Sequence, residues 1–383
     1  MKAELKELVP FIKSLYPGET PVPLHAPRFL GKEKEYLVEC IDSTFVSYVG
    51  PFVTRFEEQI RDLTGAKHAV AMVNGTSALQ MALVSCGLEP GDEVITQALT
   101  FAATANGIRH AGGEPVFVDV DRDTLGMSSL ALEKFLGTHG ERRPAGTFNK
   151  TTGRRIFAVM PMHTFGLAMD VVEVARICKA WGIALIEDAA ESVGTLVGKQ
   201  HTGTFGLASI LSFNGNKPIT TGGGGMLITN DDHVAERARH VSTTAKRKHP
   251  WEFFHDELGW NLRMPNVNAA LGCAQMDRIQ SILANKRETA ESYHQWGQEH
   301  GISFVREAEG TRANYWLNAM VVADREEREE FLAFSNSNGV QTRPIWVLMN
   351  KLPMYKDCFH GSLQESEWLG DRIINIPSSV RIA

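Results

Sequence analysis

The sequence predicts an α/β protein, with a large domain built on a mostly parallel central sheet flanked by helices and a smaller C-terminal α/β domain. Three observations support this class. The chain has 383 residues, which is more than one average domain. Residues 68–119 alternate between apolar runs of strand length and segments with helical spacing. A long helical pattern over residues 269–299 precedes two further strand patterns, near 316–322 and 340–345.

Composition and charge exclude several classes of protein. The composition is that of an ordinary water-soluble protein, with 43% hydrophobic and 22% charged residues. A formal net charge of −6, without long runs of lysine or arginine, speaks against nucleic-acid binding. The five cysteines form no Cys-x-x-Cys pair, so we expect reduced core thiols and no metal site. The N-terminus has no uninterrupted apolar stretch, so we expect no signal peptide, no membrane span and a cytoplasmic location.

The N-terminal segments predict a helix, an arm and two more helices. Residues 1–15 have the spacing of a short amphipathic helix that is interrupted or restarted at Pro10. Four prolines among residues 17–27 cannot continue it, so an extended arm follows. Residues 32–43 again have helical spacing, and a turn over 46–53 opens another helix. We assign an N-terminal helix and arm to 1–25, the large domain to 26–250 and the small domain to 251–383.

The most regular block predicts an anion site. A strand over His68–Val73 leads through a turn over 74–77 into a helix over Ala78–Cys86. Backbone N–H groups and the helix dipole at such a helix N-terminus attract anions. The candidate ligands in the turn are Gly75, Thr76 and Ser77. A helix cap without any ligand is the alternative, and a cofactor phosphate is favoured by the lysine and the aspartate described below.

A strand, helix, strand unit follows over residues 93–97, 100–110 and 115–119. Right-handed crossovers make such strands parallel neighbours in one sheet. Phe101 opens the helix just past the carboxyl end of a strand, where open α/β sheets place their ligands. A core phenylalanine is the alternative, but this position favours a ring that lines the site.

A polar segment over residues 137–155 predicts an exposed insertion between core elements. The strand after it, over 156–162, ends at His163. A lone histidine is most often structural, but its place at the end of a strand makes His163 a candidate substrate contact. A helix over 171–181 follows.

The stretch from Ser212 to Gly225 carries a single lysine, Lys217, on a tight segment between two strand patterns. The lysine of an isolated Lys-Pro pair most often lies in a surface loop. However, Asp188, near the end of a buried-type strand over 183–191, lies 29 residues earlier. Pyridoxal phosphate chemistry requires such a pair, because a lysine holds the cofactor aldehyde and a carboxylate keeps the pyridine nitrogen protonated.

The residues around Lys217 resemble a known family. Ser212-Phe213 precedes the lysine, and the four glycines Gly222 to Gly225 follow it. With Asp188, this arrangement resembles the sugar-nucleotide aminotransferases of the DegT/DnrJ/EryC1/StrS family, which are fold-type I pyridoxal phosphate enzymes. The resemblance implies that Lys217 and Asp188 are catalytic. Many members have Gly-Glu-Gly-Gly where this chain has only glycines, so the role of that glutamate is not carried over.

The same resemblance implies how the other site residues act. Phe101 stacks on the pyridine ring, and Ser212 joins the turn over 74–77 as a donor to the cofactor phosphate. Glu191, at a position where the family varies, faces the sugar or the lysine. Asn261 lies in Gly-Trp-Asn-Leu-Arg-Met, which is similar to a family motif whose asparagine reaches the cofactor phosphate of the neighbouring subunit. The resemblance therefore implies an obligate homodimer with shared active sites.

The resemblance covers almost the entire chain and is strongest for the subgroup that makes 4-amino sugars for legionaminic acid. Residues 245–256 form a basic, aromatic and histidine-rich segment. A solvated loop is the alternative, but exposed aromatic side chains usually have a partner, and this segment suits an anionic nucleotide sugar. The candidate substrate contacts are His163, Glu191, Lys246, His249, His255 and, at the rim of the site, Arg343.

The expected activity is transfer of the amino group of L-glutamate to C4 of a nucleotide-linked 4-keto-6-deoxy sugar, with UDP-2-acetamido-2,6-dideoxy-hexos-4-ulose as the first choice. A GDP-linked substrate, or C3 amination of a dTDP-linked one, is an alternative. Lys217 argues against a sugar dehydratase, whose branch has histidine there. A regulatory protein without chemistry would not need Lys217 and Asp188. A nicotinamide dehydrogenase would need Gly-x-Gly-x-x-Gly after the first strand, which is absent.

Overall fold

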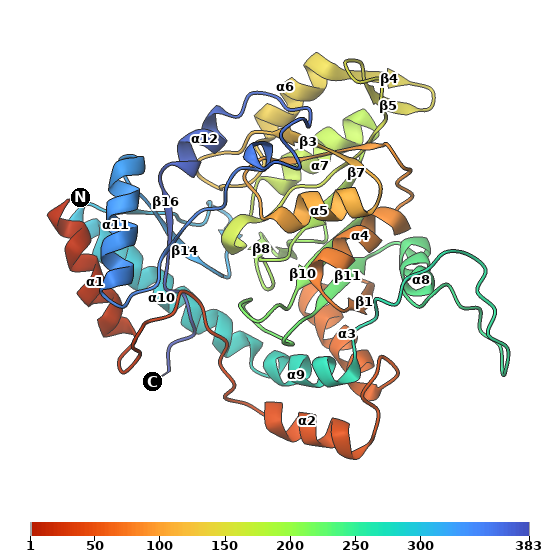
Figure 1. The fold of residues 1–383 in the computed structure, drawn as a ribbon, viewed down its shortest axis with the longest axis horizontal. Helices are drawn as coiled ribbons and strands as arrows, with labels where there is room; N and C mark the ends of the chain where they lie inside the picture. Colours follow the sequence, from red (N-terminus) through yellow and green to blue (C-terminus); the bar gives the residue numbers. More distant parts are fainter. Residues whose placement is uncertain (1, 383) are drawn as a thin grey trace.

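The computed structural model describes residues 2–382, and its largest element is a seven-stranded sheet (Figure 1). The strands, in spatial order, are β1 (His68–Met72), β11 (Gly225–Thr229), β10 (Ala208–Ser212), β7 (Ala184–Asp188), β6 (Ile156–Val159), β2 (Glu93–Gln97) and β3 (Glu114–Val118). Strand β11 is antiparallel to both of its neighbours, and every other pair is parallel. The predicted α/β class with a mostly parallel sheet is confirmed.

Helices cover both faces of this sheet because its strands are apolar on both sides. In β1, Val70 and Met72 point to one face of the sheet and pack with a first group of helices. Ala69 and Ala71 point to the opposite face and pack with a second group. The first group is α4 (Gly75–Ser85), α5 (Ala102–His110) and α8 (Asp232–Val241). The second is α3 (Pro51–Thr64), α6 (Ser129–His139), α7 (Val171–Trp181) and α9 (Asn266–Met276). The result is a three-layer domain with the strand ends at its rim.

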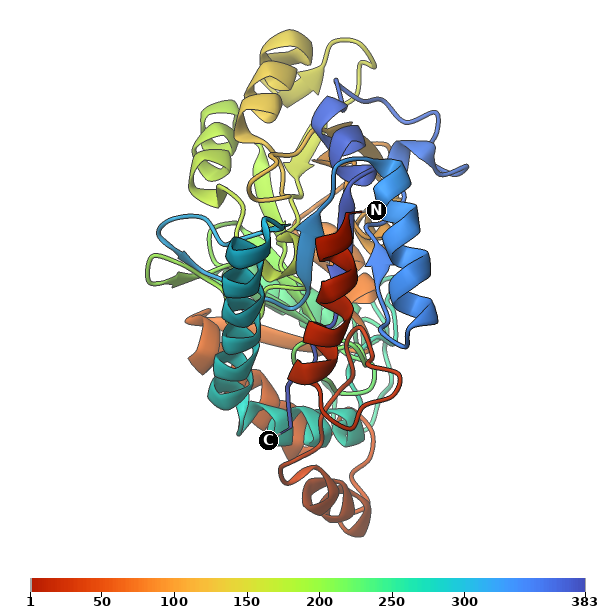
Figure 2. The same ribbon diagram turned by 90° about the vertical axis from the view of Figure 1, so that its left-hand side faces the viewer.

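A second sheet lies at the other end of the molecule (Figure 1). Its four antiparallel strands, in spatial order, are β12 (Ser303–Phe304), β14 (Asn318–Val321), β16 (Ile373–Ile376) and β15 (Arg343–Pro344). The helices against it are α1 (Ala3–Leu15), α10 (Ile279–His300) and α11 (Arg325–Ser337). Figure 2 shows α1 between α10 and α11. The N-terminal helix therefore packs on the C-terminal sheet.

Two predictions about helices were wrong. Helix α1 continues through Pro10, because Leu5, Leu8 and Ile12 on one side are fully buried and their packing offsets the hydrogen bond that proline removes. The helical pattern over 269–299 is two helices, α9 and α10, which are separated at Asp277 and Arg278. Helix α9 packs against α3 beside the main sheet.

Smaller elements complete the chain. They are α2 (Glu33–Asp42), α12 (Gln364–Gly370), the hairpin β4 (Gly140–Arg143) and β5 (Gly146–Asn149), the ribbon β8 (Leu196–Val197), β9 (Gln200–His201) and β13 (Thr311–Arg312), and the short 3-10 helices η1 (Thr164–Gly166) and η2 (Met349–Lys351). The predicted insertion is thus a hairpin, and it is partly tied to the core, since Asn149 donates to Glu93 at 2.9 Å.

Two more expectations concern cysteines and membranes. All five cysteines are free, and burial raises the pKa of the Cys86, Cys178 and Cys273 thiols to about 12. The thiols of Cys86, Cys178 and Cys273 are therefore protonated at neutral pH. Among residues 2–382 no helix combines the length and the apolar character that crossing a membrane requires.

Candidate active site

A cavity of about 650 Å³ lies at the carboxyl ends of β7 and β10 and is closed on its other side by the C-terminal sheet. Of the predicted site residues, it is lined by Gly75, Thr76, Phe101, Asp188, Glu191, Ser212, Lys217 and Arg343. These residues come from elements that are far apart in the sequence. The fold therefore brings most of the predicted site together.

Lys217 is held by the turn that follows β10. The backbone N–H of Lys217 donates to the carbonyl of Asn214 at 3.0 Å, and Phe213 is paired with Gly224 at 2.9 Å. The side chain is 10% exposed. Its Nζ lies 3.1 Å from Glu191 Oε1 and 3.6 Å from the centre of the Trp316 ring. The amine is thus aimed into the cavity between a carboxylate and an aromatic face.

Asp188 lies at the end of β7 and is almost fully buried. Its Oδ2 accepts a hydrogen bond from the Thr104 hydroxyl at 2.7 Å, and its Oδ1 accepts one from the Ala190 N–H at 3.1 Å. Burial raises the pKa of this carboxyl, and the two hydrogen bonds oppose that effect. Thr104 lies in the first turn of α5 and was not predicted as part of the site. The helical spacing of α5 alone does not show which strand its buried face meets.

Glu191 lines the cavity and is almost fully buried. It accepts a hydrogen bond from the Phe165 N–H at 2.8 Å in addition to its contact with Lys217. Burial raises the pKa of the Glu191 carboxyl to about 7, although Lys217 and the Phe165 N–H pull in the opposite direction. This carboxyl therefore changes protonation near neutral pH beside the candidate catalytic amine.

The N-terminus of α4 fits a phosphate group. The first turn of a helix leaves backbone N–H groups without helical partners, and Gly75 and Thr76 present this turn to the cavity. A Cβ atom at Gly75 would lie 3.1 Å from the Ser212 hydroxyl, so glycine keeps the space between the two segments open. At Gly225, a Cβ atom would lie 2.4 Å from the carbonyl oxygen of Asn74, so glycine lets β11 approach the turn.

Ser77 differs from its two neighbours. Its backbone N–H donates to the Asn74 side chain at 2.8 Å, which caps the helix, and Ser77 does not line the cavity. Ser77 therefore takes part in a helix cap, which was the alternative considered from the sequence. Gly75 and Thr76, in contrast, face the space that a ligand would occupy.

An aromatic group covers one side of the cavity. Phe101, at the start of α5, is 50% exposed, and its ring centre lies 5.9 Å from that of Trp346. Trp346 also contacts Phe165, with 5.1 Å between ring centres. The contributions of Trp346 and Trp316 to the cavity were not predicted. Both lie in the C-terminal segment, whose position over the main sheet depends on long-range packing.

His163 does not line the cavity, so its place as a substrate contact is corrected. The ring is fully buried, and its Nε2 lies 3.1 Å from Glu187 Oε2. Glu187 also accepts hydrogen bonds from the backbone N–H groups of Gly203, Phe205 and Gly206. His163 and Glu187, a residue of β7, thus form a buried polar pair that stabilises this part of the fold. A lone histidine most often has such a structural role.

Asn261, Lys246, His249 and His255 lie outside this cavity within one chain. Asn261 is exposed and forms a β-bridge with Thr243. The other three belong to the segment over 245–256, which extends from α8 into solvent as a long loop (Figure 1). Trp251 and Phe253 in this loop are 77% and 80% exposed. The loop therefore presents large apolar rings and cations away from its own active site.

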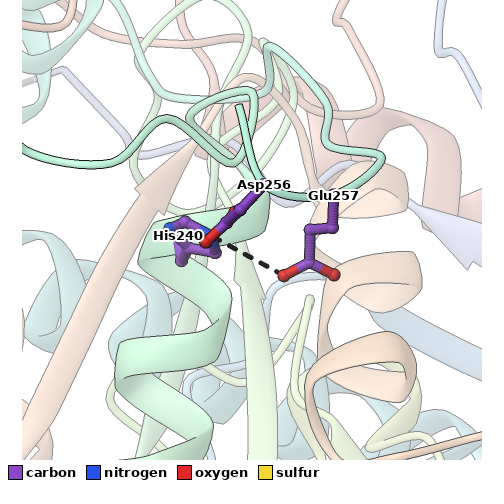
Figure 3. Close-up of side chains that lie close together, drawn as sticks. All are labelled: His240, Asp256 and Glu257. Carbon is purple, nitrogen blue, oxygen red and sulfur yellow. Dashed lines mark hydrogen bonds and ion pairs between the residues drawn. The ribbon is translucent and has the colours of Figure 1, made fainter. Parts of the chain in front are cut away.

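An ion-pair network anchors the base of this loop (Figure 3). His240 Nε2 lies 2.7 Å from Asp256 Oδ1 and 3.6 Å from Glu257 Oε1. The three side chains are close enough together to suggest a metal site. However, Arg247 pairs with Asp256 at 2.8 Å, and Arg237 pairs with Glu257. Because each carboxylate is already matched by an arginine, the cluster is an anchor for the loop.

Comparisons with known proteins agree with this geometry. The sequence pattern of the DegT/DnrJ/EryC1/StrS aminotransferase family matches residues 29–383. A GDP-perosamine synthase of Escherichia coli O157:H7 is 34% identical over 359 residues, which cover 93% of each chain. A GDP-perosamine synthase of Vibrio cholerae is also 34% identical, over 93% of this chain and 94% of the other. A solved aminotransferase of this family from Brucella abortus is 27% identical, with a TM-score of 0.82 over 91% of this chain and 90% of that one.

Proposed function

Because the chain belongs to the DegT/DnrJ/EryC1/StrS aminotransferase family and is a pyridoxal phosphate-dependent enzyme of fold type I, we propose that it transfers the amino group of L-glutamate to C4 of a nucleotide-linked 4-keto-6-deoxy sugar. The observation that carries this proposal is that Lys217, Asp188 and the N-terminus of α4 line one cavity. When bound, pyridoxal phosphate supplies an aldehyde that reacts with amines and a ring that withdraws electrons.

Lys217 is proposed as the residue that holds the cofactor and moves protons. Among the described residues that line the cavity, it carries the only aliphatic amine. Its Nζ can release a proton to Glu191 Oε1, which lies 3.1 Å away and titrates near neutral pH. A lysine that must lose its proton to react, and regain one later, needs such a neighbour.

Asp188 is proposed to face the pyridine nitrogen. Its hydrogen bonds from Thr104 and Ala190 fix the carboxylate in one orientation. A fixed negative charge at the ring nitrogen holds a proton there. Gly75, Thr76 and Ser212 are proposed to bind the phosphate, and Phe101 is proposed to cover the ring face.

A homodimer with shared active sites is proposed for two reasons. The loop over 245–256 carries exposed aromatic rings together with Lys246, His249 and His255, and such a surface is suited to a nucleotide sugar in a neighbouring subunit. A second apolar surface lies on and around α2. Its exposed members are Phe29, Leu30, Val38, Ile41, Phe45, Val46 and Val49. An apolar surface of this extent suits contact with a second copy.

The first-choice substrate is UDP-2-acetamido-2,6-dideoxy-hexos-4-ulose, by resemblance to the legionaminic acid subgroup. A GDP-linked 4-keto-6-deoxy sugar is the second candidate, since relatives at 34% identity are GDP-perosamine synthases. In either case Arg343, a cation at the cavity rim, is proposed as a contact for an anionic group of a substrate.

One experiment tests the activity and separates the substrates. The purified enzyme is incubated with pyridoxal phosphate, L-glutamate and, separately, UDP-, GDP- and dTDP-linked keto sugars, and products are identified by mass and by the position of the new amine. We expect amination at C4 and preference for the UDP-linked sugar. Lys217→Ala is the matched control and should fold but form no product. Amination at C3, or no amino sugar from any substrate, would contradict the proposal.

A further inference from the structure

A buried lysine outside the cavity is not used by the proposed mechanism. Lys286, on α10, is 1% exposed, and its Nζ has three hydrogen-bond partners. These are His25 Nε2 at 3.0 Å, the Trp316 carbonyl at 3.1 Å and the Ser378 carbonyl at 2.6 Å. Burial lowers the pKa of Lys286 to about 7 and holds the pKa of His25 well below its ordinary value. Lys286 therefore connects the N-terminal arm, the C-terminal segment and Trp316. Its three partners, one imidazole ring and two backbone carbonyls, are uncharged.

Trp316 is fixed from several directions. Its carbonyl is held by Lys286, its backbone N–H donates to Asn314 at 2.8 Å, and its indole N–H donates to the carbonyl of Asn216 at 2.5 Å. Asn216 is the residue before Lys217. The indole face then lies 3.6 Å from Lys217 Nζ, opposite the Glu191 carboxylate. Side chains with this many constraints keep one orientation, so the amine meets a preformed aromatic surface.

We propose that Trp316 is a catalytic residue that holds the free amine of Lys217 beside the reacting atoms, and that Lys286 is a positioning residue that sets the Trp316 ring. This inference rests on the proposed function, in which Lys217 bonds to the cofactor. The amine is free before the cofactor attaches and again whenever the amino donor has replaced it. The ring makes and breaks no bond. It attracts the protonated amine and limits the orientations of a long, flexible side chain, so that the amine stays within reach.

The first test uses the cofactor-free protein. Trinitrobenzenesulfonate modifies free amines, and the extent at Lys217 can be measured from the mass of its peptide. We expect Trp316→Leu to raise the modification rate of Lys217 about tenfold, because the cation–π contact and the cover are lost. Trp316→Phe keeps an aromatic face and should stay within a few-fold of the unaltered protein. Trp368→Leu is the control, since that ring lies against Arg122 and Arg372 outside the cavity.

The second test uses the loaded enzyme. The half-reaction with glutamate is followed by absorbance, and the orientation of the bound cofactor by circular dichroism in its visible band. We expect Trp316→Leu to lower the maximal rate of this half-reaction about tenfold, with little change in the KM for glutamate. The dichroism of the cofactor band should also change. Normal rates and an unchanged dichroism in Trp316→Leu would overturn the assignment of Trp316.

The role of Lys286 is tested by a double-variant cycle. Lys286→Met removes the amine and keeps the aliphatic chain. If Lys286→Met does not fold, Lys286→Gln, which retains an N–H donor, is used in its place. Either should reproduce part of the Trp316→Leu effect, and the combined variant should be no worse than Trp316→Leu alone. Additive losses would show that Lys286 does not act through the ring. Borohydride labelling of the unaltered enzyme separates the two ideas, because a label away from Lys217 overturns the proposed function itself.

Discussion

At the residue scale, Asp188 owes its orientation to Thr104. The hydroxyl of Thr104 and the N–H of Ala190 occupy one oxygen each, which leaves the carboxylate fixed at the end of β7. The carboxylate can hold a proton on a ring nitrogen only through its negative charge, because its shape alone does not attract the proton. An enzyme with the carboxylate and an enzyme with its amide analogue should therefore differ in activity.

Replacing Asp188 by asparagine keeps the shape and removes the charge. We expect Asp188→Asn to fold normally and to lose roughly a hundredfold or more in kcat, because a fixed electrostatic partner of the reacting group is lost. Steady-state kinetics with the preferred keto sugar measure the effect. Thr104→Val should cost less, since it removes one hydrogen bond to the carboxylate and leaves the charge. Near-normal turnover of Asp188→Asn would place the functional carboxylate elsewhere.

Glu191 gives the free energy of unfolding a pH dependence with a defined sign. Its pKa of about 7 in the folded protein exceeds the ordinary value of 4.5. The folded protein therefore keeps this proton over a range in which the unfolded chain has lost it. The stabilisation is complete below about pH 4.5 and is lost as the pH rises through about 7.

We expect the cofactor-free protein to lose stability from this group, on the order of 3 kcal/mol, between those two pH values. Glu191→Gln has no titrating group at this position and should lack that part of the slope. Urea unfolding of both proteins at pH 5 and pH 8 measures the difference. Parallel losses in the two proteins would show that Glu191 titrates near its ordinary pKa.

At the element scale, the site depends on how closely β11 approaches the turn before α4. A Cβ atom at Gly225 would meet backbone atoms of Asn74 and Gly75, which cannot move without shifting the α4 N-terminus. We expect Gly225→Ala to lower the free energy of unfolding by about 1–3 kcal/mol and to weaken cofactor binding. Urea unfolding and a cofactor titration measure the two effects.

Gly137 provides the matched control. It lies in α6, where a Cβ atom would meet nothing within 4 Å. Gly137→Ala should therefore leave cofactor binding unchanged and stabilise the protein by up to about 1 kcal/mol, because alanine favours a helix. Equal effects of the two substitutions would contradict the importance of the close approach at Gly225.

The elements of the main sheet could be predicted from sequence because their signals are local. The helix over 171–181 was predicted with its observed bounds, and β2 and β3 are parallel neighbours as expected. Lys217 and Asp188 could be placed near each other for the same reason, since Asp188 ends one strand of the sheet and Lys217 follows another. Identification of the family needed more than local pattern, namely the order of several motifs.

The remainder depends on contacts between distant segments. The break between α9 and α10 falls at Asp277, whose carboxylate binds Arg55 and Tyr36 from other helices. The burial of His163 depends on Glu187, and the place of Trp346 depends on how the C-terminal sheet meets the main one. Spacing along the chain carries none of this information, because each contact is decided by tertiary packing.

At the scale of the whole molecule, the proposed sharing of sites can be tested with inactive variants. Asn261 is exposed and lies outside the cavity of its own chain, as expected if it serves a partner. Asn261→Ala and Lys217→Ala should each impair activity alone. In a mixed dimer, however, both changes fall on one site and the other site carries neither.

Subunit exchange between these two variants should therefore restore activity to about a quarter of the unaltered value, since about half of the dimers are mixed and each has one intact site of two. Activity is measured before and after exchange, which is verified by mass or by differently tagged chains. Mixing Lys217→Ala with Asp188→Asn is the control, and it should restore nothing, because both residues line the same cavity. Absence of recovery with Asn261→Ala would assign that residue to its own chain.

The packing of α1 on the C-terminal sheet also determines the order in which the chain can fold during synthesis. Leu5, Leu8 and Ile12 share a cluster with Ile374 and Ile376 of β16, which are translated much later. Helix α1 can pack on α10 and α11 before then, but the part of its apolar side that meets this sheet stays uncovered until β16 has been translated. A chain that terminates before β16 keeps part of that side exposed to chaperones and proteases, so only chains that include β16 bury the apolar side of α1 fully.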